Sequence, residues 1–399
     1  MIEHNKPSPL IIVAVESKFK QFDYDRFEIT YLKQYSNVVI WDLSILSSKS
    51  FNKAISANPY KGNDLKIISS YAKLISELLF IKKNYKKKDI FIMNFIGPSS
   101  LSSLIFLIAI KKLGFNIIKY DNAGIPNIWI KNMNRTLHYV VKTLMRRTYF
   151  LVLKLFNIFP THCIYAGDYY KKKYDRTVNK KKTKLLRGNT WDYSKILSKT
   201  VIDSEQYTGY QKRAVLLDGA GPMFNSDDVN IGKKTYLSSE HWYPALVSFL
   251  EKVEKETNTK VDIAAHPKTS FCSNPSCFGR RNVLYGKTME MVRDSDFVIT
   301  RQSTAISYAI IFKKPVIIIY SNQLKEDNLA MARLNRTSEL LGTVPVNINS
   351  NFEGLSDRLK INELCYEAYK KNYLTSIDLP RSNAQILLED ILFIKTLKT

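Results

Sequence analysis

Cysteine is scarce in this sequence, with four residues among 399. Cys163 and Cys365 stand alone, and the spacing of Cys272 and Cys277 matches no common zinc pattern. A zinc site would also need a second cluster of His or Cys, which the sequence lacks. We therefore expect reduced thiols that pack as small apolar side chains, and neither a disulfide framework nor a zinc centre.

Long apolar segments are missing as well. No window reaches the roughly 18 uninterrupted apolar residues that a membrane-spanning helix needs. The segment from Met1 to Pro9 contains Glu3 and His4 and lacks the basic and then apolar order of a secretory signal. The sequence therefore predicts a cytoplasmic protein.

Acidic residues are rare in one half of the chain. Residues 1–200 contain 35 Lys or Arg and 13 Asp or Glu, a net charge of +22, whereas residues 201–399 contain 25 and 23, a net charge of +2. An AT-rich genome that favours lysine is one explanation, but it would raise both halves alike. We therefore expect the first half to face an anionic surface or polymer.

What the chain does have is a regular alternation of strand and helix patterns. Short, apolar, β-branched segments predict strands, and longer segments with helical spacing predict helices. In the first half the strands are 8–15, 37–43, 89–94 and 115–120 and the helices 65–84 and 101–114; in the second half the strands are 214–217, 260–265, 296–299 and 315–320 and the helices 242–256, 288–293 and 303–312. This alternation is typical of parallel sheets wrapped by helices.

The length of the chain favours two such domains. A polar stretch at 195–212 is the expected linker. We predict an α/β protein with an N-terminal Rossmann-like domain at 1–205, a second one at 206–375 that faces it across a central cleft, and a C-terminal helix at 376–399.

One helical segment, 139–159, mixes basic and apolar residues and includes Arg146 and Arg147. It either lies in a membrane interface, with its basic side chains reaching lipid head groups, or packs on the sheet as an ordinary amphipathic helix. The neighbouring lysine runs 171–173 and 180–182 favour the membrane.

Candidate ligand-binding residues follow the predicted strands of the second half, and ligands of parallel sheets bind beyond the carboxyl ends of strands. Thr300, Arg301, Ser303 and Thr304 follow the strand 296–299. Ser303 and Thr304 are expected to begin a helix, whose unpaired N–H groups attract phosphate. Ser and Thr are also ordinary helix N-caps, so a purely structural role stays open.

Two further groups follow the other strands of this half. His266, Pro267 and Lys268 come after the strand 260–265, where a histidine suits a general acid or a donor to phosphate. Asp218 precedes Gly219 at the end of the strand 214–217, where a carboxylate can act as a general base. A turn-forming Asp-Gly pair is the structural alternative.

In this order, Asp218-Gly219, His266-Pro267 and Ser303-Thr304 resemble the motifs of bacterial GT-B glycosyltransferases of the sialyl-, polysialyl- and Kdo-transferase type. Residues 295–316 are similar to the nucleotide-binding segment of capsule and lipopolysaccharide transferases. The resemblance covers residues 190–320 best. Leu217 stands where this group often has a second acidic residue.

The resemblance implies a GT-B fold and an inverting transfer of a nonulosonic or ulosonic acid from a CMP donor, without metal or cofactor. The acceptor is then a growing capsule or lipopolysaccharide glycan, free or lipid-linked, at the inner face of a bacterial inner membrane. Asp218 would deprotonate the acceptor hydroxyl and His266 would protonate the leaving phosphate. The implied nucleotide site consists of His266, Pro267, Lys268, Thr300, Arg301, Ser303 and Thr304.

Three alternatives remain beside this hypothesis. A GT-B enzyme with a UDP- or GDP-sugar donor keeps the fold and uses Lys268 and Arg301 at the diphosphate. A basic nucleic-acid-binding protein would explain the charge, but no nucleic-acid motif is present and we expect no nucleic-acid partner. A non-catalytic protein of polysaccharide export is the third alternative.

Overall fold

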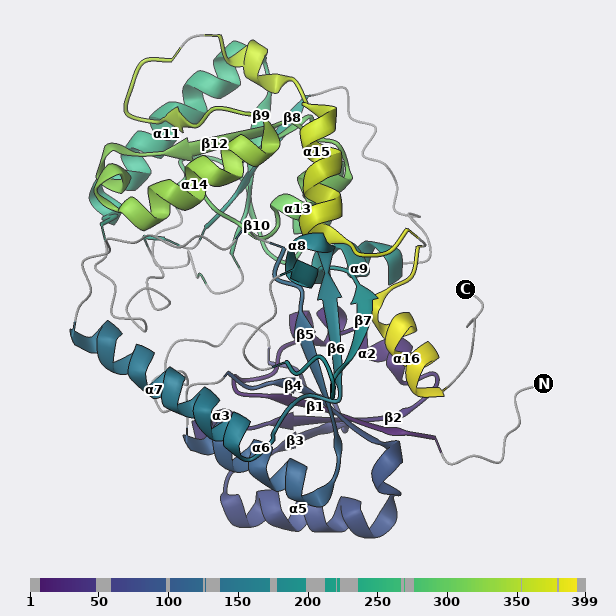
Figure 1. Ribbon diagram of the computed structural model, residues 1–399. Helices are drawn as coiled ribbons and strands as arrows, with labels where there is room; N and C mark the ends of the chain where they lie inside the picture. The colour runs from purple at the N-terminus through teal and green to yellow at the C-terminus, as the bar shows by residue number, and fades with distance from the viewer. Residues whose placement is uncertain are drawn as a thin grey trace. The chain divides into compact units, whose positions relative to one another are not determined.

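The computed structural model describes residues 8–47, 59–97, 101–124, 126, 137–172, 178–198, 212–219, 221–222, 236–266, 269, 276–352, 354–378 and 380–392. The chain divides into two compact units (Figure 1). The first consists of Met1–Asn122, Val141–Thr200 and Thr375–Thr399, and the second of Ala123–Val140 and Val201–Leu374.

The first unit contains a seven-stranded sheet in the order β3-β2-β1-β4-β5-β6-β7. All neighbouring strands are parallel. The strands are β1 (Leu10–Val15), β2 (Asn37–Asp42), β3 (Leu65–Ile67), β4 (Ile90–Phe95), β5 (Asn116–Asp121), β6 (His162–Ala166) and β7 (Lys184–Gly188). Every residue of β1 is buried, which explains why its sequence is apolar without alternation.

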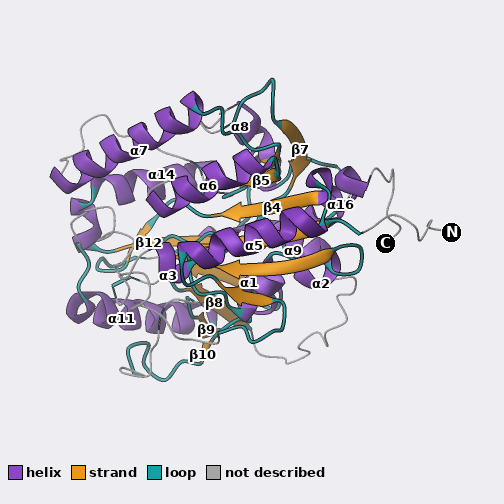
Figure 2. Cartoon of the chain, turned by 90° about the horizontal axis from the view of Figure 1, so that it is seen from below, coloured by secondary structure: helices purple, strands orange, loops and turns teal. Residues whose placement is uncertain are grey.

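Helices cover both faces of this sheet, and Figure 2 shows α5 and α6 lying across its strands. On one face α5 (Tyr71–Asn84), α6 (Leu101–Leu113) and α7 (Leu137–Leu155) contribute Leu78, Phe106 and Leu153 to one core cluster. On the other face the second cluster contains residues of α2 (Ile29–Leu32), α9 (Trp191–Ser198) and α16 (Asn383–Leu392). The remaining helical elements are α1 (Gln21–Arg26), α3 (Ser44–Ser47), the 3-10 turn η1 (Lys87–Asp89) and α8 (Gly167–Lys172).

The C-terminal segment returns to the first unit and is held there at both ends of α16. At its start the N–H of Ala384 donates to the buried carboxylate of Glu28 over 3.2 Å, and the hydroxyl of Ser194 donates to the same carboxylate. Burial raises the pKa of Glu28 to about 7, although these hydrogen bonds favour its charged form.

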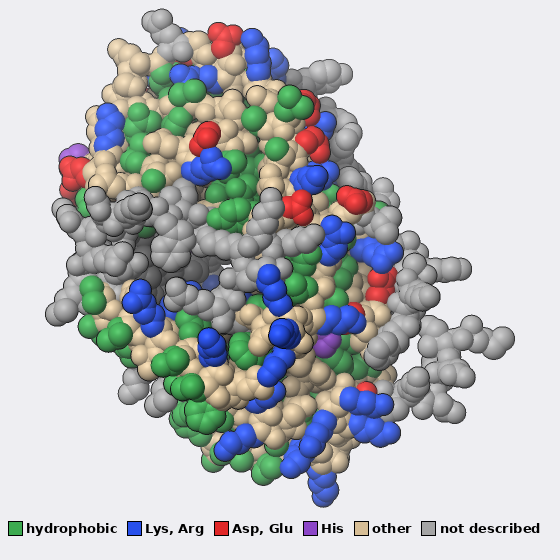
Figure 3. Space-filling view, viewed as in Figure 1, with side chains coloured by type: hydrophobic (Ala, Val, Ile, Leu, Met, Phe, Trp, Pro, Cys, Tyr) green, Lys and Arg blue, Asp and Glu red, His purple; other side chains and the backbone are tan. Residues whose placement is uncertain are grey.

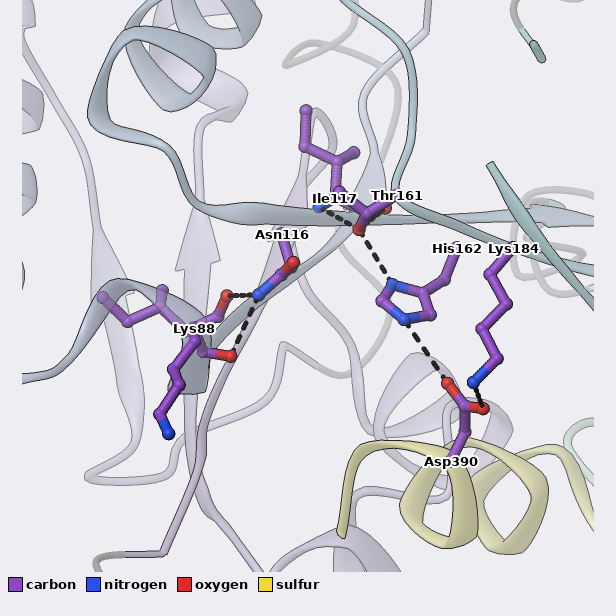
Figure 4. Close-up of polar contacts among 8 residues, drawn as sticks. Lys88, Asn116, Ile117, Thr161, His162, Lys184 and Asp390 are labelled. Atoms are coloured by element: carbon purple, nitrogen blue, oxygen red, sulfur yellow. Dashed lines mark hydrogen bonds and ion pairs between the residues drawn. The ribbon is translucent and has the colours of Figure 1, made fainter. Parts of the chain in front are cut away.

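At the other end of α16, Asp390 lies between two basic side chains at the amino edge of the sheet (Figure 4). Its carboxylate is 3.3 Å from Nε2 of His162 and 2.5 Å from Nζ of Lys184. Burial by itself would raise the pKa of Asp390, but hydrogen bonds from His162 and Lys184 hold it below its usual value. These contacts join the last described helix to β6 and β7.

The second unit contains a six-stranded parallel sheet in the order β10-β9-β8-β11-β12-β13. Its strands are β8 (Arg213–Leu217), β9 (Lys260–Ala264), β10 (Val283–Leu284), β11 (Phe297–Thr300), β12 (Val316–Tyr320) and β13 (Val346–Asn347). Its helices are α11 (Ser239–Thr257), α12 (Thr288–Arg293), α13 (Ile306–Ile311), α14 (Asn328–Leu341) and α15 (Glu363–Tyr369), with shorter turns η2 (Asn322–Glu326), η3 (Leu355–Leu359) and η4 (Lys370–Leu374).

All eight predicted strands are present, but three predicted helices differ from their predicted bounds. Of the predicted C-terminal helix at 376–399, the described part is helical from Asn383 to Leu392, and 393–399 lie outside the described residues. The predicted helix at 65–84 is wrong at its start, because 65–67 pairs with β2 as an edge strand and Ser70 caps α5 by accepting from the N–H of Lys73. The predicted helix at 303–312 is shorter and begins at Ile306. Several elements have no counterpart among the predicted ranges, including β6, α8, β7 and α9 in the first unit and β10, α14, β13 and α15 in the second.

The unit boundaries differ from the predicted domain limits in two segments. The stretch 123–140 belongs to the second unit and not to the first, and the C-terminal segment from Thr375 belongs to the first unit. An antiparallel bridge between Asn189 and Thr375 marks this return. Most of the predicted linker, 199–211, lies outside the described residues.

Candidate active site in the second unit

The candidate site begins where the strand order of the second sheet reverses. β8 has β9 on one side and β11 on the other, so the connections that leave β8 and β11 diverge at this point. In open parallel sheets such a switch point leaves a crevice beyond the carboxyl ends of the two strands. Asp218 and Gly219 follow β8, and Arg301 follows β11.

Arg301 and Gly219 meet across this switch point. Nη2 of Arg301 donates to the carbonyl oxygen of Gly219 over 3.3 Å, and its guanidinium lies 5.7 Å from the ring centroid of Trp242 in α11. A Cβ at position 219 would lie 3.1 Å from the carbonyl oxygen of Gln302, a tight contact that favours glycine at this close approach. Sequence reasoning missed Trp242, because nothing local in its helix marks it as a neighbour of Arg301.

The structure also brings Asp218 and His266 together. Oδ2 of Asp218 accepts the backbone N–H of His266 at 3.3 Å and lies 3.5 Å from the hydroxyl of Thr269. Thr269 in turn donates to the carbonyl oxygen of His266 at 2.7 Å. Asp218 is thus buried, and its carboxylate accepts a hydrogen bond from the turn that follows β9. The side chain of His266 in this turn is half-buried.

The negative charge of Asp218 also affects the pKa of a cysteine, Cys277. Burial, and after it the negative charge of Asp218, raises the pKa of Cys277 to about 11. Cys163, Cys277 and Cys365 are free thiols in this structure, and Cys272 lies outside the described residues. This raised pKa favours the protonated thiol of Cys277 at neutral pH.

The residues after β11 form a short turn before α13. Oγ of Ser303 accepts the N–H of Ala305 at 3.2 Å, and the N–H of Ser307 donates to the carbonyl oxygen of Thr304. Ser303 and Thr304 therefore precede the helix and are not its first residues. Thr300 is buried, and its hydroxyl contacts the carbonyl oxygen of Leu217 at 3.5 Å.

A small hollow opens beside this turn. Side chains from β12, α14 and α15 complete its lining, and none of them was singled out by sequence reasoning. The lining residues are Thr300, Arg301, Gln302, Ser303, Ile306, Ile318, Leu334, Thr337 and Tyr369. Three of the predicted site residues thus share one concave surface with an aromatic and a hydroxyl group.

Two predicted site residues, Pro267 and Lys268, lie outside the described residues. Within the described part of the chain, no three His, Cys, Asp or Glu side chains gather as metal ligands would. Transfer without a metal or cofactor stays a prediction.

The first unit has a switch point of its own, between β1 and β4. There the N–H of Gly97, which follows β4, donates to Oε2 of Glu16 over 2.9 Å, and a Cβ on Gly97 would lie 2.9 Å from Oε1 of the same carboxylate. Burial raises the pKa of Glu16, and the hydrogen bond from Gly97 partly opposes that rise. This crevice therefore already contains an acidic side chain of the protein.

Comparisons with known proteins agree on the fold. No protein-family model matches the sequence, and no curated protein matches it. Among solved structures, a Listeria monocytogenes protein of the UDP-N-acetylglucosamine 2-epimerase type has a TM-score of 0.52 with 10% identity and covers 99% of each chain. The glycosyltransferase SnogD from Streptomyces nogalater has a TM-score of 0.50 with 8% identity, over 97% of this chain and 99% of its own.

The chain has a GT-B fold, with two parallel α/β Rossmann-like units. At these identities the similarity concerns the fold alone. The predicted cleft between the units and the sialyltransferase subtype stay predictions.

Proposed function

We propose that the protein is a glycosyltransferase that uses a nucleotide-sugar donor and binds it in the second unit. The observation that carries this proposal is the contact between Arg301 and Gly219 across the switch point of the second sheet, with Asp218 and His266 at the same edge. A guanidinium beside closely approaching backbone suits a phosphate or diphosphate.

A UDP- or GDP-sugar is the donor that the present observations favour. The L. monocytogenes neighbour is of a type named for a UDP-sugar, and SnogD is a glycosyltransferase. Two phosphates carry more charge than one, and Arg301, with Lys268 in the sequence that follows β9, supplies basic partners for both.

A CMP-linked nonulosonic or ulosonic acid is the second candidate donor. The order of Asp218-Gly219, His266-Pro267 and Ser303-Thr304 supports it, because it resembles the order in sialyl- and Kdo-type transferases. The missing second acidic residue at Leu217 weakens that resemblance.

In either case we assign the same roles to the edge residues. Asp218 acts as the base toward the acceptor hydroxyl, and His266 donates to the phosphate as it leaves. Ser303 and Thr304, with Arg301 and Thr300, line the phosphate side of the site. Because the nucleotide leaves as a stabilised anion, no metal is needed, and a single base favours inversion of the anomeric centre.

The proposed acceptor is a growing surface polysaccharide, capsule or lipopolysaccharide, as a free or lipid-linked glycan. The reaction would then take place at the inner face of a bacterial inner membrane. Nucleic acid is not among the proposed partners.

A panel of nucleotides tests the donor. We expect UDP or GDP to raise the melting temperature of the purified protein more than CMP, CDP or ADP does, because ligands stabilise the state that binds them. Arg301→Gln should remove this stabilisation, whereas Arg280→Gln, an exposed arginine of the same unit, should leave it intact. Selective stabilisation by CMP would instead favour the acid-sugar donor, and no response to any nucleotide would contradict the proposal.

Asp218→Asn tests the proposed base. The amide oxygen still accepts the N–H of His266, so the turn is preserved while the basic carboxylate is lost. Transfer should fall by about 10²–10⁴ with little change in melting temperature. Unchanged transfer would reduce Asp218 to a structural residue. Interconversion of a nucleotide sugar without any acceptor would indicate an epimerase.

A further inference from the structure

The outer side of α7 is unusually apolar for a surface exposed to water. Large apolar side chains along the helix, and one just beyond its end, are between 47% and 72% exposed. They are Val140, the last residue of the second unit's segment in this helix, and Val141, Leu144, Met145, Leu151, Leu155 and Phe156 of the first unit. With about 100° of turn per residue they fall within one arc of about 160°, which we call the apolar arc. Outside this arc the helix buries Tyr149 and Leu153 in the core.

Lysines gather at the amino edge of the same unit's sheet. Three stretches far apart in sequence precede β4, β5 and β7, and because all the strands are parallel these stretches meet at one edge. Their exposed lysines, which we call the basic edge, are Lys82, Lys83, Lys86, Lys87, Lys88, Lys111, Lys112, Lys180, Lys181 and Lys182. The tertiary structure thus combines three separate runs into one cationic surface.

The apolar arc and the basic edge adjoin each other. After α7 the chain reaches the amino end of β6 at His162 within a few residues, and Nζ of Lys182 donates to Oδ1 of Asn157 over 2.7 Å. This places the exposed Leu155 and Phe156 beside the lysines that precede β7. Figure 3 shows hydrophobic side chains along α7 and many Lys and Arg side chains on the same face of the unit.

We propose that the apolar arc and the basic edge together dock the protein on an anionic lipid bilayer. Apolar side chains enter the interface between head groups and acyl chains, and lysines bind the anionic head groups. The helix carries no acidic residue, and Arg146, Arg147 and Lys154 add to its positive charge. No helix in the described part of the chain is long and apolar enough to cross a membrane.

Two other occupants fit less well. A second copy of the chain would bring one basic edge toward another, which opposes association through electrostatic repulsion. A soluble polyanion would bind the lysines but would leave the apolar arc in water. Only a surface that is both apolar and anionic satisfies both features.

The docking surface rests on the membrane location given in the proposed function and explains it, and it does not depend on which nucleotide-sugar is the donor. Its failure would leave nucleotide binding in the second unit unchanged, and the reverse holds as well. The nucleotide panel therefore tests the donor site, and vesicle binding tests the docking surface, independently of each other.

Cosedimentation with lipid vesicles tests the docking surface. Vesicles of phosphatidylcholine with 30% phosphatidylglycerol should bind the full chain at least about tenfold more tightly than vesicles of phosphatidylcholine alone, and added salt should weaken this binding. Equal binding to both kinds of vesicle, or binding to neither, would overturn the proposal.

Two sets of substitutions locate the surface. The triple variant Leu144→Ser, Leu151→Ser, Leu155→Ser should lower vesicle binding by about tenfold or more, because three inserted side chains lose their apolar surface. Leu364→Ser is the matched control, since Leu364 is 84% exposed in α15 of the second unit. Equal loss in the control, or none in the triple variant, would contradict the assignment.

A second set of substitutions removes positive charge from the basic edge and has its own matched control. Lys87→Gln, Lys88→Gln, Lys180→Gln and Lys181→Gln together should abolish the preference for anionic vesicles. The control changes four exposed lysines of the second unit, Lys255, Lys260, Lys287 and Lys371, to glutamine and should keep that preference. If the parent protein is a dimer that binds no vesicles, and the apolar triple variant is a monomer, the apolar arc mediates self-association and the proposal is overturned. Heparin binding without vesicle binding would indicate a soluble polyanion, and it would overturn the proposal too.

Discussion

The two units share one strand order but use its switch point differently. In each sheet the first strand lies between the second and the fourth, counted along that unit. At the switch point of the first unit the carboxylate of Glu16 accepts the N–H of Gly97. In the second unit the corresponding crevice presents Arg301 against Gly219. Both switch points therefore have a carboxylate just after the first strand, Glu16 or Asp218, and in the second unit the guanidinium of Arg301 is added.

The difference shows that net charge and local charge can point in opposite directions. The first half carries nearly all of the excess positive charge, yet the ten lysines of the basic edge lie at the amino ends of its strands, and the carboxylate of Glu16 lies at the carboxyl end of β1. The second half is nearly neutral but places a guanidinium where ligands of such sheets bind. For this reason we assign the phosphate to the second unit and the anionic bilayer to the first.

The largest expected effect is a loss of transfer activity at the switch point of the second unit. His266→Ala should lower transfer by about 10²–10⁴, because it removes the proposed proton donor to the leaving phosphate. Glu16→Gln, the matched change at the other switch point, should leave nucleotide stabilisation unchanged. Steady-state rates and nucleotide-induced melting shifts measure the two effects. Normal turnover of His266→Ala would remove this residue from the mechanism.

Shortening one buried leucine in each unit compares the stability of the two units. Leu387 in α16 and Leu250 in α11 are both fully buried, one in each unit. Each change to alanine should cost about 2–5 kcal/mol. If the units unfold separately, calorimetry should show each variant lowering a different transition. A single transition that both variants shift alike would show that the units unfold together.

A pH effect should be confined to the first unit. The pKa of Glu28 is raised from 4.5 in an unfolded chain to about 7 in the folded protein, so the folded state binds the proton more tightly. Its contribution to stability is full below pH 4.5 and is lost as the pH rises through 7, a change of about 3 kcal/mol. Glu28→Gln should flatten this dependence in chemical denaturation between pH 4.5 and 8. A slope identical to that of the parent protein would refute it.

The smallest expected effect concerns the surface of the second unit. Arg336 and Glu339 form an exposed ion pair of 2.7 Å one helical turn apart in α14. Replacing Glu339 with glutamine should change the free energy of unfolding by less than about 1 kcal/mol, because solvent screens such pairs. A larger loss in urea denaturation would mean that this surface is buried against another part of the protein.

Much of the fold could be predicted from the sequence because its strands are short, buried and apolar. Ile11 to Val13 and Ile317 to Ile319 are nearly inaccessible to solvent, and such runs are readable without any partner. Less regular segments were missed. β7 has only two apolar residues between polar ones, and β3 is a three-residue edge strand that merges with a helical pattern.

The candidate site was predictable in part for a similar reason. A residue that directly follows a buried strand must lie at the carboxyl edge, so Asp218, His266 and Arg301 were identified by position. The sequence contains no local signal for Trp242 or Tyr369, which reach the site from helices far along the chain.

The alternation of strand and helix, the strand-end location of the candidate residues and the uneven charge can all be read from the sequence. These depend on local apolar patterns and on composition, which need no knowledge of distant contacts. Only the tertiary structure decided which residues meet. It joined Arg301 to Gly219 across 82 positions, carried Ala384 back to Glu28 across 356, and gathered three lysine runs at one edge. Such contacts follow from strand order and chain return, and these are set by the packing of the whole chain rather than by any segment of it.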